Sequence, residues 1–279
     1  MGAFTPSGLG WHRDLPDPRD FHFEHDAVVE LLRDLPKAGA RPERVDLREY
    51  CGPVADQQDL ATSSVCACLG LVQYFERRTT GRVLEPAPLF VYRTARRWLG
   101  WSGDSGLALR PALKTIVRFG LPPERLWPCA ADRWDGDPEA FVYAAADRLE
   151  GVTYWRLDPR HGRPEDTLET VKRFLAAGFA IAFGFPISTS VNGEAEIPFP
   201  TIFDGVRGGQ AVLAVGYDDT RRVRSDRGAL LFANSWGPAW GDAGYGWLPY
   251  TYVREQLAVD FWTLVTCQWL AAGELQSPK

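Results

Sequence analysis

The chain changes character near residue 150, and this division restricts the folds open to it. Before that point, apolar residues recur at i, i+3 and i+4 and predict helices over 63–79, 88–99, 106–119 and 138–149. After it, segments rich in β-branched and aromatic residues predict strands at 152–157, 179–185, 211–217, 229–236 and 260–265, with one helix at 165–177. This order predicts an α+β fold of two lobes with a cleft between them.

The expected organisation is an extended arm followed by one two-lobed domain. Residues 1–45 are rich in Pro, Asp and Arg and predict the arm. The domain then covers 46–279, divided into a helical lobe (46–150) and a lobe built on an antiparallel β-sheet or barrel (151–279). A chain of 279 residues, 45% of them apolar, can bury a core of this size.

Composition limits the partners and the compartment. The formal charge of −5 and a pI near 5.5 give no electrostatic reason to expect nucleic acid or an anionic membrane. No apolar run approaches the roughly 20 residues that span a bilayer, and the N-terminal stretch lacks the apolar core of a secretory signal. We therefore expect a cytoplasmic protein of unknown oligomeric state. The five scattered cysteines favour free thiols over a disulfide framework, although a single bridge stays open.

Three segments carry the functional signal. Residues 53–68 read PVADQQDLATSSVCAC, residues 208–218 read GGQAVLAVGYD, and residues 234–246 read NSWGPAWGDAGYG. Together they resemble the active-site segments of the papain-like (C1) cysteine peptidases, in particular bacterial members. The family patterns are P-V-x-D-Q-G-x-x-G-S-C, G-H-A-V-x-x-V-G-Y and N-S-W-G-x-x-W-G-x-x-G-Y. The resemblance implies a papain-like two-lobe fold, with the site in the cleft.

The resemblance also implies that both reactive residues are replaced. Ser63 occupies the position of the nucleophilic cysteine and Gln210 that of the general-base histidine, whereas Asn234 and the oxyanion glutamine Gln57 are retained. A hydroxyl without an adjacent base stays protonated at neutral pH, and a helix dipole contributes only about 0.3–1 kcal/mol. A carboxamide does not titrate near neutrality and cannot accept the proton. The simplest interpretation of Ser63 is a helix N-cap.

Other side chains offer weak alternatives. Cys66 and Cys68 follow Ser63 by three and five residues, but cysteine is often only a small buried hydrophobe. None of the four histidines, at positions 12, 22, 25 and 161, lies in a strand context that matches the family pattern. His22 and His25 have a loose ligand-like spacing but are expected to be solvated, so no metal or cofactor is predicted.

Further departures cluster around Ser63. Gln58 and Ala61 replace glycines that are usual in the family, and Thr62 replaces a serine. An engineered Cys-to-Ser change would alter one position only. The accumulated changes therefore indicate that the peptidase chemistry has been abandoned while the framework is kept.

The retained framework predicts a pocket that still binds a ligand. The GDSG loop at 103–106 falls where papain-like proteins pair with an extended peptide, which makes Asp104 and Gly106 candidate ligand contacts. The loop at 188–209 is expected to overhang the cleft and to offer Asp204, and Trp236 is expected to shield the polar pair of Gln210 and Asn234. A plain turn, a solvated loop and space-filling tryptophans are the simpler interpretations.

Two classes of function remain open from the sequence. One is a pseudo-peptidase whose cleft binds a peptide or a small acyl-type ligand without cutting it. The other is a repurposed enzyme that acts by acyl transfer through Ser63, or by cyclisation or isomerisation of a small substrate such as a secondary metabolite. Asp59, Asp104 and Asp204 are the candidate acids for the second class. An open cleft favours the enzyme, whereas a cleft filled by side chains or by the arm favours the binding protein.

Overall fold

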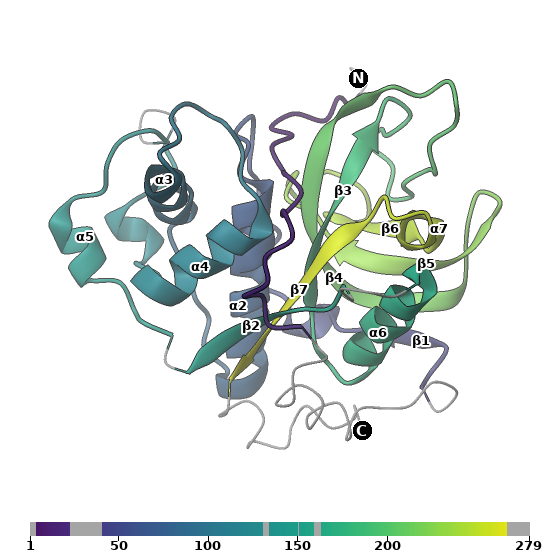
Figure 1. The fold of residues 1–279 in the computed structure, drawn as a ribbon, viewed down its shortest axis with the longest axis horizontal. Coiled ribbons are helices and arrows are strands. Elements are labelled where there is room, and N and C mark those ends of the chain that lie inside the picture. The colour runs from purple at the N-terminus through teal and green to yellow at the C-terminus, as the bar shows by residue number, and fades with distance from the viewer. Residues whose placement is uncertain (1–3, 23–40, 131–133, 150, 159–162, 267–279) are drawn as a thin grey trace.

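The computed structural model describes residues 4–22, 41–130, 134–149, 151–158 and 163–266. They form two lobes that lie side by side, one mostly helical and the other built on a sheet that further helices accompany (Figure 1). The helical lobe contains α2 (Ser63–Thr80), α3 (Pro88–Leu99), α4 (Leu109–Phe119) and the short α5 (Ala140–Ala144), with 3-10 turns at Arg48–Tyr50 and Glu124–Leu126. The predicted helix at 138–149 is thus mostly irregular, and the prediction of α4 began three residues early.

The second lobe is built on one antiparallel sheet. Its strand order is β2-β7-β3-β4-β5-β6, with β1 paired to β4 at one side. The strands are β1 (Arg44–Asp46), β2 (Val152–Arg156), β3 (Ile181–Ser188), β4 (Val206–Val223), β5 (Asp226–Ala233), β6 (Tyr245–Pro249) and β7 (Val259–Thr266). The outer strands β2 and β6 do not pair with each other, so the barrel considered as one form of this lobe is wrong and the sheet is open.

Local sequence explains where the helices begin and end. Pro88 occupies the first turn of α3, where its missing N–H has no cost. Gly81 and Gly100 end α2 and α3 in the left-handed conformation that glycine adopts without strain. In the sheet lobe, the described residues form the helices α6 (Pro164–Ala176) and α7 (Thr251–Arg254). No helix among the described residues is long and apolar enough to cross a membrane.

The lobes share one hydrophobic core. Helix α2 packs against β4 and β3, and buried aromatic side chains such as Tyr74 and Phe183 lie within the same continuous cluster. This packing fixes α2 against the strand that carries Gln210. The start of α2 and the second quarter of β4 are thereby brought together at the junction of the lobes.

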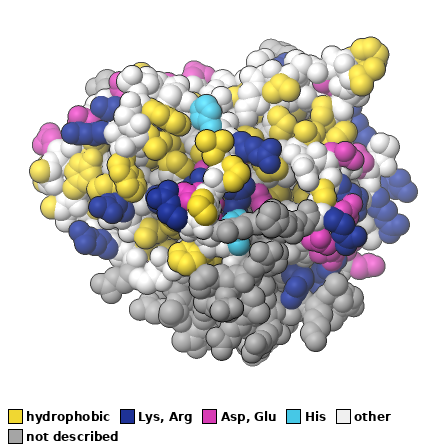
Figure 2. Space-filling model, viewed as in Figure 1, with side chains coloured by type: hydrophobic (Ala, Val, Ile, Leu, Met, Phe, Trp, Pro, Cys, Tyr) yellow, Lys and Arg dark blue, Asp and Glu magenta, His cyan; other side chains and the backbone are white. Residues whose placement is uncertain are grey.

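The described part of the arm runs along that junction. Residues 4–22, drawn in purple, pass between the helical lobe and the sheet (Figure 1). Seen from the same side, side chains of all types lie along the upper part of the line between the lobes (Figure 2). The arm is therefore part of the interface between the lobes.

Candidate functional site

Gln210 lies at the centre of a buried polar cluster. Its side chain is fully buried on β4, opposite Phe185 of β3. The two hydrogens of its Nε2 face three acceptors: Asn234 Oδ1 at 2.9 Å, Gln57 Oε1 at 3.0 Å and Ser235 Oγ at 3.2 Å. The contact between Gln210 and Asn234 is the one that the sequence motifs predict. All these groups are neutral amides or hydroxyls, so the cluster offers no proton acceptor that titrates near neutrality.

Ser63 opens helix α2 and is also fully buried. The expected N-cap role is wrong, because Thr62 is the N-cap residue and Ser63 already has a place within the helix. The Ser63 Oγ instead accepts a hydrogen bond of 3.3 Å from the backbone N–H of Ala211, the residue after Gln210. The hydroxyl therefore links the two lobes.

Both polar atoms of the Gln57 side-chain amide have hydrogen-bond partners. Its Nε2 donates to the carbonyl oxygens of Gly8 and Leu60, both at 2.8 Å. Its Oε1 accepts from Gln210 and, at 2.5 Å, from the Ser235 hydroxyl. The amide that would face the carbonyl of a bound peptide thus faces a carbonyl of the chain's own arm.

Gln58, next to Gln57, has a backbone conformation that glycine, the usual residue of the family pattern here, adopts more easily. Gln58 has φ of 52°, in the left-handed region that side chains other than glycine adopt only with strain. Its N–H is held by the Asp56 carboxylate at 2.9 Å, which helps to stabilise the turn. The turn of the family pattern is therefore retained although the residue that favours it is not.

The arm makes backbone hydrogen bonds to both lobes. The N–H of Trp11 donates to Gly209 O at 3.0 Å, in the sheet lobe, and the N–H of Leu107 donates to Gly10 O at 2.8 Å, in the helical lobe. A Cβ on Gly106 would lie 2.0 Å from Gly10 O, so only glycine permits this approach. An extended segment lies beside Gly106, and it is the chain's own arm; the contact of Gly106 with a separate ligand stays a prediction.

Trp236 is covered by the same arm. The ring of Phe4 lies 5.4 Å from that of Trp236, which in turn makes an edge contact with Trp240 at 5.1 Å. Trp240 is almost fully buried and donates its Nε1–H to Asn192 O. The tryptophans therefore fill space beside the polar cluster and also offer an aromatic contact to what lies in the cleft.

Asp104 and Asp204 are held by partners outside the Gln210 cluster. Asp104 accepts hydrogen bonds from the Ala61 N–H at 3.2 Å and the Tyr92 hydroxyl at 2.5 Å. Asp204 accepts from the N–H and hydroxyl of Thr201, and the first of these bonds is the main cause that lowers its pKa. Asp59 is exposed. None of the three has a hydrogen bond or ion pair with the Gln210 cluster among the described residues.

The neighbouring thiols are not activated. Burial raises the pKa of Cys66 to about 12 and that of Cys68 well above its ordinary value, so neither is a thiolate near neutral pH. Cys51, Cys66, Cys68 and Cys129 are unbridged, while Cys267 lies outside the described residues.

No described histidine takes the place of the missing base. The ring of His12 contacts Ser105 O and the edge of Trp101 in the helical lobe. His22, at the end of the described part of the arm, contacts Asp158 O just after β2. His25 and His161 lie outside the described residues, so the proposed spacing of His22 and His25 finds no structural account. No group of three or more metal-ligating side chains occurs in the described ranges.

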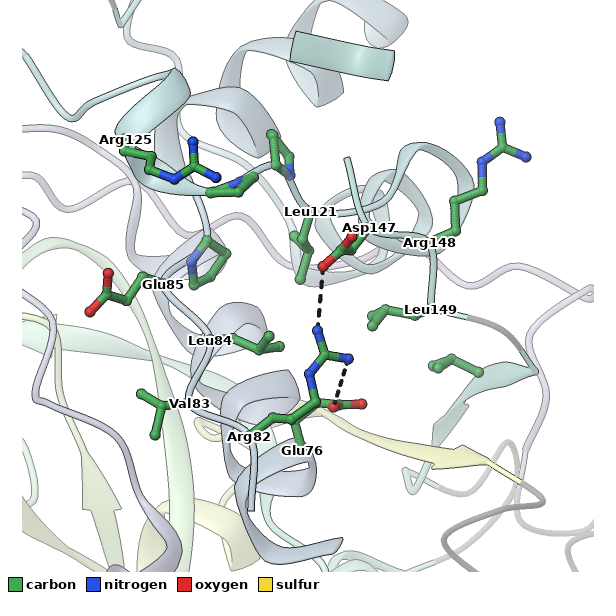
Figure 3. A pocket seen from close by; sticks show the side chains of 14 residues that line it. Glu76, Arg82, Val83, Leu84, Glu85, Leu121, Arg125, Asp147, Arg148 and Leu149 are labelled. Carbon is green, nitrogen blue, oxygen red and sulfur yellow. Dashed lines mark hydrogen bonds and ion pairs between the residues drawn. The ribbon is translucent and has the colours of Figure 1, made fainter. Parts of the chain in front are cut away.

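Little space remains at the site itself. The cavity that touches Asn234 and Ser235 has a volume of about 50 Å³, far below the several hundred Å³ of a typical ligand pocket. A larger hollow of about 510 Å³ lies elsewhere in the helical lobe, where Arg82 bridges Glu76 and Asp147 (Figure 3). None of the residues that the motifs single out lines it.

Comparison with known proteins agrees with this geometry. Residues 189–256, which include Gln210 and Asn234, match the family described as papain family cysteine protease. An uncharacterized peptidase C1-like protein of Acanthamoeba polyphaga mimivirus is 33% identical over 92% of this chain and 86% of its own length. The chain therefore belongs to the papain-like C1 family.

Solved structures show the same fold. Xylellain, a cysteine protease from Xylella fastidiosa, matches with a TM-score of 0.74 and 29% identity over 95% of this chain and 98% of its own. A digestive procathepsin L2 from the larval midgut of Tenebrio molitor matches with a TM-score of 0.68 over 92% of this chain and 77% of its own, at 18% identity. The second likeness concerns the fold alone.

The sequence did not single out the residues of the arm that fill the cleft. Gly8, Gly10 and Trp11 lie far from the three motifs, as does Gly184 in β3. The G-x-G-W pattern of the arm was the available signal, because two glycines around one residue permit a close backbone approach. The pattern itself does not indicate which part of the fold the arm packs against.

Proposed function

We propose that this papain-like protein is not a peptidase and that its cleft holds an extended peptide segment without cutting it. In the described structure, the segment is the chain's own residues 4–12. The observation that supports this most is the buried Gln210 carboxamide at the position of the general base, held by Gln57, Asn234 and Ser235.

The chemistry of the site supports the same conclusion. A serine nucleophile needs a base within hydrogen-bond reach, and the Ser63 hydroxyl has the Ala211 N–H instead. Gln57, which would stabilise an oxyanion, donates to two backbone carbonyls. Nucleophile, base and oxyanion donor are therefore all absent or engaged elsewhere.

The alternative of a repurposed acyl-transfer, cyclisation or isomerisation enzyme has less support. Ser63 is fully buried. The candidate acid Asp104 binds Tyr92 and the Ala61 backbone, and Asp204 binds its own loop. The arm also fills the space that a small substrate would need, since its backbone is hydrogen-bonded on both sides of the cleft. No specific contact in the described residues favours that class.

The test is an assay of the purified chain with broad fluorogenic peptide substrates and with a thiol-directed epoxide. We expect no turnover above the uncatalysed rate and no covalent label, because Ser63 has no base. An active papain-like enzyme serves as the positive control. Turnover comparable to that enzyme, or a label at the cleft, would contradict the proposal.

A further inference from the structure

The indole of Trp11 rests where two neighbouring strands carry no side chain. A Cβ on Gly184 of β3 would lie 2.0 Å from Trp11 Cε2, and a Cβ on Gly209 of β4 would lie 2.7 Å from Trp11 Cε3. Glycine inside a strand weakens it and commonly marks a close approach by another group. The two glycines form a flat notch, which we call the indole seat.

The backbone that precedes Trp11 is equally restricted. A Cβ on Gly10 would lie 2.2 Å from the Cβ of Ala61, and a Cβ on Gly8 would lie 2.4 Å from Leu60 O. Gly8 also has φ of 63°, in the left-handed region. The cleft therefore fits glycine at both positions and an indole directly after the second, in the order Gly-x-Gly-Trp.

Recognition of the ring depends on its shape. The indole Nε1 of Trp11 is buried and has no hydrogen-bond partner among the described residues. The backbone N–H of Trp11 supplies the directional contact, to Gly209 O. The seat thus selects a flat ring of this size, while the adjacent strand fixes its register.

A separate anchor holds the arm beyond this segment. Asp14 accepts hydrogen bonds from the Arg110 N–H and the Trp262 indole, and its own N–H donates to Asp260 at 2.7 Å. Asp20 forms two hydrogen bonds with the Arg110 guanidinium. Because these contacts begin at Asp14, residues 4–12 can leave the cleft while the anchor stays in place.

We propose that the cleft is a receptor for Gly-x-Gly-Trp peptide segments, with the seat of Gly184 and Gly209 as the determinant of specificity. The arm is the resident ligand, and a segment of the same sequence from another chain can take its place. This inference rests on the proposed function, since it names the class of peptide that the cleft holds. A tethered segment has an effective concentration on the order of millimolar, so exchange is measured best after the resident Trp11 has been weakened.

The first experiment uses free indole and the full-length variant Trp11→Ala. We expect indole to bind saturably and to raise the melting temperature by roughly 5 °C at concentrations well above its dissociation constant, with no such effect on the unmodified chain. The matched control is Trp11→Ala with Gly184→Ala, whose added methyl group fills the seat. Indole that stabilises neither variant, or both equally, would overturn the proposal.

The second experiment titrates the Trp11→Ala variant with acetyl-Gly-Leu-Gly-Trp-His-amide and measures binding by calorimetry. Peptides with Leu in place of Trp, or Ala in place of the second Gly, should bind at least about tenfold more weakly, because one loses the ring and the other clashes with Ala61. Equal binding of the three peptides, or none, would overturn the proposal.

Mass spectrometry of the recovered peptide separates this inference from the proposed function. Intact peptide that binds in the expected order supports both. Cleaved peptide would contradict the non-catalytic function while leaving the indole seat in place, whereas intact peptide without selective binding would contradict the seat alone.

Discussion

At the scale of single residues, Gln210 and Ser63 lie at the positions that the family motifs give to the catalytic pair. Gln210 preserves the hydrogen bond to Asn234 that a base at this position would make, but a carboxamide cannot take up a proton. Ser63 preserves the start of α2 and uses its hydroxyl as an acceptor for the opposite lobe. Both residues therefore contribute hydrogen bonds at the interface between the lobes.

Restoring the pair should restore a reactive thiol. In Ser63→Cys with Gln210→His, we expect alkylation of Cys at position 63 to continue below pH 7, because a neighbouring imidazolium lowers the pKa of a thiol. In Ser63→Cys alone, the rate should fall steeply below the ordinary thiol pKa. Iodoacetamide labelling between pH 5 and 9, in variants that also carry Trp11→Ala to admit the reagent, measures both. Identical pH profiles would show that the cleft no longer supports the pair.

At the scale of elements, the arm is held by two different kinds of contact. Residues 8–12 are bound by backbone hydrogen bonds and the indole seat, whereas Asp14 and Asp20 enter a buried cluster of charges. This cluster includes Arg110 of α4, Arg156 of β2 and Asp260 of β7. Asp14 and Asp20 thus join both lobes through ion pairs, whereas residues 8–12 join them through backbone hydrogen bonds and close packing.

The charged anchor makes arm docking depend on pH. Burial raises the pKa of Asp14 to about 6 and that of Asp260 to about 7, so the docked arm holds protons more tightly than the released arm. Docking is therefore strongest near pH 4 and weakens as the pH rises through 6 and 7. Hydrogen exchange at the Asp14 amide, which donates to Asp260 in the docked arm, should show less protection at pH 8 than at pH 5 once it is corrected for its chemical rate.

The variant Asp14→Asn is the control for that measurement. It keeps a side chain of the same size but cannot ionise, so the part of the pH dependence that comes from Asp14 should disappear while the part from Asp260 remains. An unchanged pH dependence in this variant would show that the Asp14 carboxyl does not contribute.

At the scale of the whole molecule, the arm contributes to the junction of the lobes. It contacts Gln57, Leu107 and Ala61 on the helical side and Gly184 and Gly209 on the sheet side. The arm is not the sole connection between the lobes. The start of α2 and strand β4 are also joined directly, by the hydrogen bond between Ser63 and Ala211.

Loss of the Trp11 ring should therefore lower global stability by a limited amount. We expect Trp11→Ala to reduce the free energy of unfolding by about 2–4 kcal/mol, somewhat below the usual loss for a fully buried tryptophan. Trp98→Ala is the matched control, because Trp98 is 49% exposed on the helical lobe and should cost less than half as much. Urea denaturation of the three proteins measures the difference, and equal losses would argue against a structural role of the arm.

The sequence by itself determined the family, the two-lobe order and the identity of the residues that align with the family's catalytic positions. These features are encoded over short distances: the motifs span 11 to 16 residues, and α2, α3, β3 and β5 follow from local periodicity. Strand β6 was not predicted, because its five residues lie close behind a motif dominated by turns and glycine.

Only the tertiary structure decided what fills the cleft and how its polar groups are paired. Gln57 meets Gly8 across 49 residues, and Trp11 meets Gly184 across more than 170, so neither contact has a local signal. The partner of Ser63 likewise lies 148 residues away, on a strand whose position depends on the packing of α2 against the sheet. The open form of the sheet likewise depends on contacts between residues that are distant in the sequence. Whether β2 and β6 meet depends on the twist and packing of all the strands between them.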